Sequence, residues 1–318
     1  MRKIIIVLLT LIFMTSLEIG LAAEDYAYAE FPLQRNGISL HLDRMSAGQT
    51  DQNILLVHGA TYSTHEFDID YQDYSLVRRL CREGYDVWRL DIAGYGRSGK
   101  VEDGLTITTA YAAEDIAAAV DLILGETGQE RIDLFGWSWG TMTTGRYASM
   151  HSEKINRLVL YAPILSGIGE REIVEPFNHN TWEGAAEDFQ KNEDGTFNTE
   201  ITEQIMIDLF CSRCWKYDQD ASPNGWRVDA FQDSSVTLID LKAIKVPTLV
   251  ICGDRDPYLN YELVYASLDS LPAGSELKVI PGAAHAMIFE KPFYQEFQNT
   301  VVDFLEESTE VQEQDEAA

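Results

Sequence analysis

The chain has 318 residues, 45% of them hydrophobic and 24% charged, which is enough apolar material for one large domain or a domain with an insertion. Its 52 acidic residues against 24 basic ones give a formal net charge of −28. A surface this acidic repels phosphate backbones, so nucleic acid is excluded as an expected partner.

The first element along the chain is a predicted secretory signal over residues 1–23. A short basic start precedes an apolar run over residues 4–17, and the small residues Ala22 and Ala23 suit cleavage. The run is too short to span a membrane comfortably. We therefore expect a secreted or periplasmic protein with no stable membrane insertion after signal removal, the alternative being an uncleaved anchor.

A hairpin and then alternating strands and helices follow the signal. Two alternating segments flank Asn36-Gly37, a dipeptide typical of two-residue hairpin turns. Beyond them, short apolar runs alternate with segments of helical spacing, an order typical of a mostly parallel α/β sheet with helices on both faces. The predicted strands are 26–33, 38–45, 53–59, 85–92, 132–136, 155–163, 246–254 and 276–282, and the predicted helices are 74–84, 108–128, 141–151, 261–271 and 293–307.

The alternation is interrupted over residues 164–241, which are polar, acidic and rich in aromatic side chains with mostly helical apolar spacing. We expect these residues to be a helical insertion in an α/β core made of residues 24–163 and 242–306. The last segment, 307–318, is acidic and poor in apolar residues, and is predicted to be a disordered tail.

One serine stands at the junction between a predicted strand and the next predicted helix. Ser138 lies in the stretch GWSWG, and a serine at such a tight turn has strained backbone angles. Gly136 and Gly140 suit this turn, because side chains there would collide with neighbouring backbone. The turn raises the hydroxyl above the sheet edge and puts the N–H of Trp139 at a helix N-terminus. Ser138 is therefore the candidate nucleophile.

A serine nucleophile needs a general base, and the base needs an acid to orient it. Asp256 and His285 each follow a predicted strand, and their chain order after Ser138 is the one that a nucleophile elbow predicts. The backbone N–H groups of Ala60 and Trp139 are expected to form an oxyanion hole. His58 is expected to brace the loop beside Ala60, because His285 already supplies the base.

These motifs resemble the α/β-hydrolase superfamily over nearly all of the mature chain outside the insertion. The match includes HGAT at the oxyanion loop, DIAGYGRSG after the next strand, GWSWG at the elbow, GDRD at the acid and GAAH at the base. The resemblance implies an α/β-hydrolase fold, Asp256 rather than Asp254 as the acid, and an insertion that caps the active site. The tryptophan after the nucleophile, Trp139, is similar to that of proline-iminopeptidase-like members.

The leading interpretation is an exported serine hydrolase that cleaves a carboxylic ester or related small acyl compound without a metal or organic cofactor. One alternative is an aminopeptidase in which an acidic residue of the insertion, Glu183 first, binds a substrate ammonium. A cofactor-free haloperoxidase or perhydrolase-like activity would use the same triad. A catalytically silent binding protein of the same fold is the interpretation from a different functional class.

Two further motifs carry little weight. The glycines in GYGRSG match a dinucleotide fingerprint, but no helix is predicted to follow directly, so we expect no nicotinamide or flavin cofactor. Cys211 and Cys214 have the spacing of a redox or metal pair, and a local disulfide or two plain thiols are both expected ahead of zinc. Cys252 lies in a predicted apolar strand and is expected to be buried.

Overall fold

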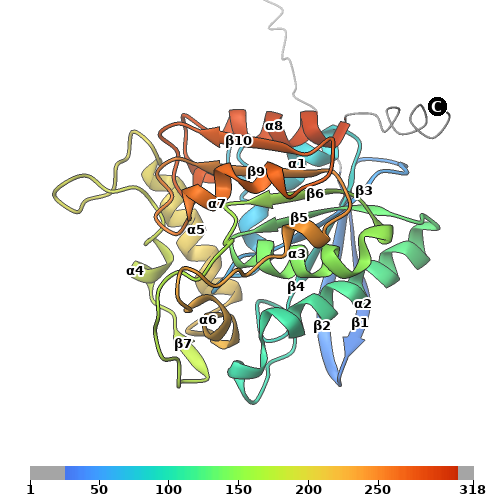
Figure 1. The fold of residues 1–318 in the computed structure, drawn as a ribbon, viewed down its shortest axis with the longest axis horizontal. Helices are drawn as coiled ribbons and strands as arrows, with labels where there is room; N and C mark the ends of the chain where they lie inside the picture. The colour runs from blue at the N-terminus through green and yellow to red at the C-terminus, as the bar shows by residue number, and fades with distance from the viewer. Residues whose placement is uncertain (1–25, 307–318) are drawn as a thin grey trace, which may run out of the picture.

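Figure 1 shows the computed structural model of the chain, which describes residues 26–306. The predicted signal at 1–23 and the predicted tail at 307–318 lie outside the described residues. One eight-stranded sheet forms the centre, with the strand order β1-β2-β4-β3-β5-β6-β9-β10. The predicted α/β class is therefore confirmed.

The strands of the central sheet match the predicted ones to within a few residues at each end. They are β1 (Ala27–Arg35), β2 (Ile38–Ser46), β3 (Asn53–Val57), β4 (Asp86–Asp91), β5 (Ile132–Trp137), β6 (Ile155–Tyr161), β9 (Thr248–Gly253) and β10 (Glu276–Ile280). The helices of the core are α1 (Leu76–Arg82), α2 (Thr109–Thr127), α3 (Trp139–His151), α7 (Tyr261–Tyr265) and α8 (Tyr294–Glu306).

The hairpin forms as the Asn-Gly dipeptide predicts. Asn36 and Gly37 both adopt positive φ angles, 51° and 79°, as a type I′ turn requires. The turn sets β1 antiparallel to β2, and β2 pairs antiparallel with β4. All other neighbours in the sheet, from β4 to β10, pair in parallel.

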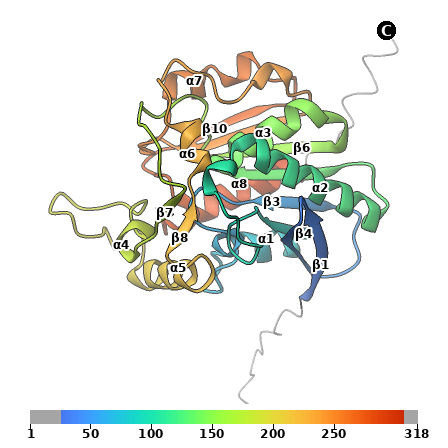
Figure 2. The same ribbon diagram turned by 90° about the horizontal axis from the view of Figure 1, so that it is seen from below.

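Helices cover both faces of the sheet, which explains why its parallel strands are continuous apolar runs. In β3, Ile54 and Leu56 belong to the core layer that contains buried residues of α1 and α8. Leu55 and Val57 belong to the opposite layer, under α2 and α3. Figure 2 shows α1 and α8 on the side of the sheet away from α2 and α3.

One predicted helix is shorter than expected. The segment predicted as a helix over 261–271 forms α7 only as far as Tyr265, followed by a 3₁₀ turn at Ser267–Asp269. Serine and aspartate side chains compete with helical backbone hydrogen bonds, and the following Pro272 cannot extend a helix, so the pattern of apolar residues overstated its length.

Residues 164–241, called the insert below, contain several short elements. These are β7 (Phe177–His179), α4 (Trp182–Ala185), α5 (Gln204–Tyr217), β8 (Ala221–Pro223) and α6 (Gly225–Ala230). β7 and β8 form a second, two-stranded antiparallel sheet. In Figure 1 the insert lies beside the edge toward which the arrows of β9 and β10 point, which is the carboxyl-terminal edge of the parallel strands.

A buried carboxylate at the end of α5 attaches the insert to the core. Asp218 accepts hydrogen bonds from the backbone N–H groups of Ser63 and Gly96, and its Oδ2 lies 2.8 Å from Nε2 of His65. The side chain of Asp218 is almost fully buried. A buried carboxylate is tolerated when donors surround it in this way, so these three contacts fix α5 against the loops after β3 and β4.

Among residues 26–306, no helix has the length and apolar character that crossing a bilayer would require.

Candidate active site

Ser138 forms the turn between β5 and α3 and has φ 56° and ψ −119°. A positive φ is strained for a residue with a side chain, and it is retained only where the surroundings hold it. The N–H of Ser138 donates to the carbonyl of Tyr161 at 2.9 Å, and its carbonyl accepts from the N–H of Thr141 at 2.8 Å. Both bonds hold the backbone of Ser138 in place, and the residue lines a cavity.

The two glycines that flank Ser138 are required for the reason predicted. A Cβ atom on Gly136 would overlap the carbonyl of Gly140. A Cβ atom on Gly140 would lie 2.6 Å from the carbonyl oxygen of Val57, at the end of β3. Small residues at both positions therefore allow α3 to start directly against the neighbouring strand.

Asp256 and His285 form a buried pair in the loops after β9 and β10. Nδ1 of His285 lies 2.7 Å from Oδ2 of Asp256, and Oδ1 of Asp256 accepts the N–H of Tyr258 at 3.0 Å. Asp254 is instead exposed and accepts the N–H of Gly282. The geometry thus pairs His285 with Asp256, and the carboxylate leaves Nε2 as the basic nitrogen of the neutral ring.

The charges around His285 favour its protonated form. Burial disfavours the imidazolium, but the carboxylates of Asp256, Asp188 and Glu290 outweigh it and raise the pKa of His285 from 6.5 to about 9. Of the three carboxylates, Asp256 contributes most to this rise in pKa. The ring is therefore suited to accept a proton and to hold it.

The loop after β3 approaches Ser138 closely and carries a free backbone donor. Among residues 26–306, neither the N–H of Ala60 nor that of Trp139 has a hydrogen-bond partner. A Cβ atom on Gly59 would lie 3.3 Å from Cβ of Ser138, so glycine permits this approach. Two unpartnered N–H groups beside a serine hydroxyl have the composition of an oxyanion hole.

His58 braces this loop, as expected. The N–H of Ile92 donates to Nε2 of His58 at 3.1 Å, so Nδ1 carries the proton and donates to the carbonyl of Gly59 at 2.7 Å. Burial lowers the pKa of His58, which keeps the ring neutral. A fully buried, neutral histidine with both nitrogens occupied cannot act as the general base.

Two acidic residues near the site, Glu66 and Glu290, were not predicted, and a third, Asp188, is one of the acidic residues of the insertion among which an ammonium ligand was expected. Glu66 is buried, accepts the N–H of Gly59 at 3.0 Å, and has its pKa raised well above 4.5 by burial. Glu290 accepts the N–H of Ala284 at 3.0 Å and so supports the loop that carries His285. Asp188 of the insert accepts a hydrogen bond from the hydroxyl of Tyr258 at 2.8 Å. No motif identifies Glu66 or Glu290, because their burial depends on how the surrounding loops pack and not on the neighbouring sequence.

Ser138 and His285 line one cavity of about 420 Å³, together with Ala60 and Glu66. This is within the usual range for a small-molecule site. The insert supplies much of the remaining wall, including Ile168, Arg171, Asp188, Phe210, Trp226 and Arg227.

Glu183, the carboxylate predicted first as the ligand of a substrate ammonium, does not face the cavity. Glu183 is exposed on α4 and is not part of the cavity wall. Glu187 and Asp188, one turn further along, do line the cavity. The physical reason is that α4 is a single short turn that presents its first residues to solvent, so nearby positions face different directions.

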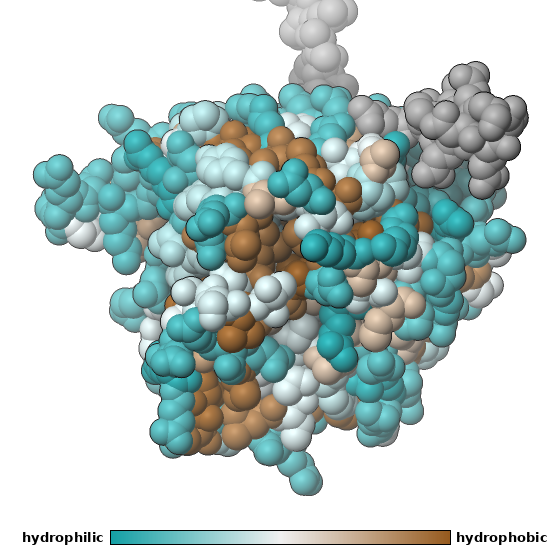
Figure 3. Space-filling view, in the orientation of Figure 1, coloured by the Kyte–Doolittle hydropathy of each residue, from teal (hydrophilic) through white to brown (hydrophobic). Residues whose placement is uncertain are grey.

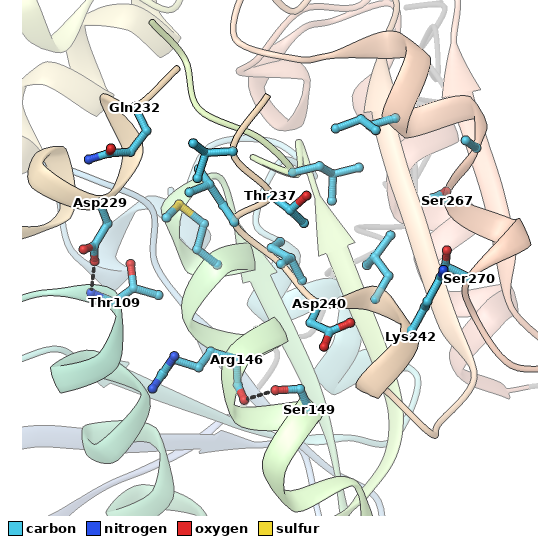
Figure 4. A pocket seen from close by; sticks show the side chains of 18 of the residues that line it. Thr109, Arg146, Ser149, Asp229, Gln232, Thr237, Asp240, Lys242, Ser267 and Ser270 are labelled. Carbon is cyan, nitrogen blue, oxygen red and sulfur yellow. Dashed lines mark hydrogen bonds between the residues drawn. The ribbon is translucent and has the colours of Figure 1, made fainter. Parts of the chain in front are cut away.

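A second, larger cavity of about 860 Å³ lies between α3 and the segment that leads from the insert back to β9. On the face of the molecule seen in Figure 3, apolar side chains gather in a hollow near the centre. Figure 4 shows the polar groups of the larger cavity. Asp229 accepts the N–H of Thr109, and the hydroxyl of Ser149 donates to the carbonyl of Arg146. None of the predicted site residues lines it, so its greater size does not make it the reaction site.

The described residues offer no group of three histidine, cysteine or acidic side chains that could hold a metal ion. All four cysteines are buried free thiols, so Cys211 and Cys214 are plain thiols here and Cys252 is buried as expected. After β4, the glycine-rich segment forms turns, and the next α-helix, α2, begins only at Thr109. The segment thus lacks the direct strand-to-helix turn that a dinucleotide site needs.

The chain matches one protein family and several known proteins. The family described as alpha/beta hydrolase fold matches residues 52–292. A Synechocystis sp. protein named as a candidate non-heme chloroperoxidase is 26% identical over 263 residues, covering 79% of this chain and 89% of that protein. A non-heme haloperoxidase from Rhodococcus erythropolis is 26% identical over 256 residues, covering 74% and 85%.

Among solved structures, an esterase from Exiguobacterium antarcticum superposes with a TM-score of 0.63 at 20% identity, over 86% of this chain and 98% of that one. That likeness concerns the fold alone. The chain belongs to the α/β-hydrolase fold family and is a hydrolase of that fold.

Proposed function

We propose that this protein is an exported serine hydrolase that cleaves a carboxylic ester or a related acyl compound through a triad of Ser138, His285 and Asp256. The observation that carries the proposal is the arrangement around one cavity. Ser138 and His285 line it, Asp256 lies 2.7 Å from Nδ1 of His285, and the N–H groups of Ala60 and Trp139 have no partner in the described chain.

The proposed reaction has two stages. Nε2 of His285 takes the proton of Ser138 as its Oγ attacks the acyl carbonyl, and the N–H groups of Ala60 and Trp139 stabilise the oxyanion. The intermediate collapses to an acyl-enzyme, and His285 returns the proton to the departing alcohol. Water, deprotonated by His285, then attacks the acyl-enzyme, which releases the acid and restores Ser138. Asp256 orients the ring and stabilises the imidazolium throughout.

Replacement of Ser138 by alanine tests the proposal. A fluorophosphonate probe, which reacts with activated serines, should label the wild type and not Ser138→Ala. Hydrolysis of a series of p-nitrophenyl esters should fall by at least about a thousandfold in the variant, given the size of triad effects. Circular dichroism should show an unchanged fold. A wild type that is neither labelled nor active would favour the silent binding protein, and preferred turnover of aminoacyl-naphthylamides would favour the aminopeptidase.

A second candidate reaction is perhydrolysis, favoured by the two relatives named as haloperoxidases. In that reaction hydrogen peroxide replaces water in the attack on the acyl-enzyme, releasing a peracid and restoring Ser138. Incubation of the protein with a short ester and hydrogen peroxide should then produce peracid. Release of the carboxylic acid alone, at every peroxide concentration, would argue against this candidate.

Export follows from the predicted signal and is tested separately. Protein recovered from outside the cytoplasm should begin near Ala23 or Glu24 on N-terminal sequencing. An intact Met1 in a membrane fraction would contradict this and favour an uncleaved anchor.

A further inference from the structure

An arginine of the insert reaches the cavity without a counter-ion. Arg227 on α6 donates from one terminal nitrogen to Oδ1 of Asn224 at 2.8 Å and from the other to Oγ1 of Thr61 at 3.2 Å. Its guanidinium also lies 4.5 Å from the ring centre of Trp226. Within residues 26–306, no aspartate or glutamate oxygen comes within 4.0 Å of it. Both of these acceptors are neutral, and three of the five N–H donors have no acceptor in the described part of the chain.

A second arginine lies at the same cavity. Arg171 packs over the ring of Phe231, with 5.7 Å to the ring centre, and within the described chain it too lacks an acidic partner. Burial, and to a smaller extent the charge of Arg171, lower the pKa of Arg227. An arginine nevertheless stays protonated at neutral pH. The cavity therefore holds a partly buried cation whose charge is repelled by its neighbour and, among residues 26–306, is balanced by no ion pair.

The acidic residues of the cavity wall make no ion pair with either arginine among the described residues, although the charge of Glu187 favours protonated Arg227 from a greater distance. Asp188 accepts the hydroxyl of Tyr258, whose ring packs against His285, so this carboxylate serves the histidine side of the cavity. Glu187 is exposed and makes no ion pair within the described residues. A ligand anion in direct contact with the guanidinium would offset the cost of partly burying Arg227, which no described side chain does by contact.

We propose that Arg227, assisted by Arg171, binds a carboxylate of the substrate, so that the preferred substrates are anionic esters. This inference rests on the proposed function. Arginine suits the task because its planar guanidinium binds a carboxylate through two parallel hydrogen bonds. Since Arg227 contacts Thr61, the residue after Ala60, the carboxylate lies on the side of the cavity next to the oxyanion loop. Arg227 acts here on specificity, away from the reacting atoms.

The test compares anionic esters with neutral esters of similar shape. p-Nitrophenyl hemiglutarate against p-nitrophenyl pentanoate places the carboxylate in the acyl part, and 4-acetoxybenzoate against phenyl acetate places it in the leaving group. The variants are Arg227→Gln, Arg227→Lys and, as a control, Arg131→Gln, which alters an exposed arginine outside the cavity. kcat/KM is measured for each protein on all four esters.

For the wild type we expect the anionic member of at least one pair to be preferred. Arg227→Gln should lower kcat/KM for that ester by about 10- to 100-fold, which corresponds to about 1.4–2.8 kcal/mol, and change the neutral ester by less than about twofold. For the anionic ester, kcat/KM of Arg227→Lys should lie between those of the wild type and Arg227→Gln, and that of Arg131→Gln should match the wild type. An equal loss on anionic and neutral esters would overturn the proposal and show that Arg227 only positions the loop at Thr61. A wild type without anionic preference would overturn it as well.

A binding measurement keeps the two proposals separable. Glutarate binding is measured by calorimetry on Ser138→Ala and on the double variant Ser138→Ala/Arg227→Lys. Weaker binding in the double variant supports the carboxylate site even if the protein hydrolyses none of the esters, whereas the failure of fluorophosphonate labelling concerns only the proposed function. Absence of glutarate binding to Ser138→Ala, in a protein that hydrolyses neutral esters, overturns the carboxylate site and leaves the esterase proposal intact.

Discussion

Replacement of Asp256 by asparagine tests the proposed triad most directly, because the expected loss can be worked out from the structure. The surroundings raise the pKa of His285 from 6.5 to about 9, and Asp256 is their largest favourable contribution. A difference of about 2.5 in pKa corresponds to about 3 kcal/mol in favour of the imidazolium, or about 300-fold in rate if the transition state retains it. Asparagine also fails to hold the correct tautomer at Nδ1, so the loss should lie between about 300-fold and about 10⁴-fold.

The pH dependence of kcat/KM gives a second test, because the direction of its expected change is known. Only the neutral imidazole accepts the serine proton, so kcat/KM of the wild type should rise with pH as His285 deprotonates, up to about pH 9. Removing the charge of Asp256 lowers the pKa of His285, so the rise should move to lower pH in Asp256→Asn. The assay is hydrolysis of a short neutral p-nitrophenyl ester across neutral and alkaline pH, corrected for spontaneous hydrolysis.

The matched control is Asp254→Asn, two residues away in the same loop. Asp254 is exposed and binds the N–H of Gly282, so its replacement should leave kcat/KM within a few-fold of the wild type. Equal losses in both variants, or a larger loss in Asp254→Asn, would refute the assignment of Asp256 as the acid. An unchanged pH profile in Asp256→Asn would refute the electrostatic argument itself.

Two further predictions concern stability. Gly136→Ala should destabilise the protein by at least about 2 kcal/mol in urea unfolding, because the added Cβ meets the backbone of Gly140. The control, Gly125→Ala, has open space in α2 and should stabilise the protein by about 0.5–1 kcal/mol. An unchanged free energy of unfolding in Gly136→Ala would contradict the close approach. Burial raises the pKa of Asp133 from 3.8 to about 7, so the folded protein holds this proton more tightly than the unfolded one and loses up to about 4 kcal/mol of stability as the pH rises from about 4 to 7. Asp133→Asn should therefore raise Tm more at about pH 8 than at about pH 4.5, and equal changes at both pH values would show that the carboxyl is not buried in this way.

Local patterns in the sequence were enough to predict a mostly parallel sheet, the order of its strands and helices along the chain, and which candidate residues follow those strands. Asn36-Gly37 specifies a turn through two positive φ angles, and a continuous apolar run specifies a strand covered on both faces. The three predicted residues Ser138, Asp256 and His285 each follow a strand, and parallel strands bring their carboxyl ends to one edge. Neighbouring residues carry these signals, so no knowledge of distant contacts was needed.

The surroundings of the site were decided only by tertiary packing. Asp218 becomes a buried acceptor by meeting an N–H of Ser63, 155 positions earlier in the chain, and Arg227 reaches Thr61 across 166 positions. The sequence of an acidic stretch does not show which carboxylates face solvent and which face a cavity, so it does not distinguish the exposed Glu183 from Asp188, which lines the wall. Burial and charge at these positions depend on how the insert lies against the core, and that arrangement exists only once both have folded.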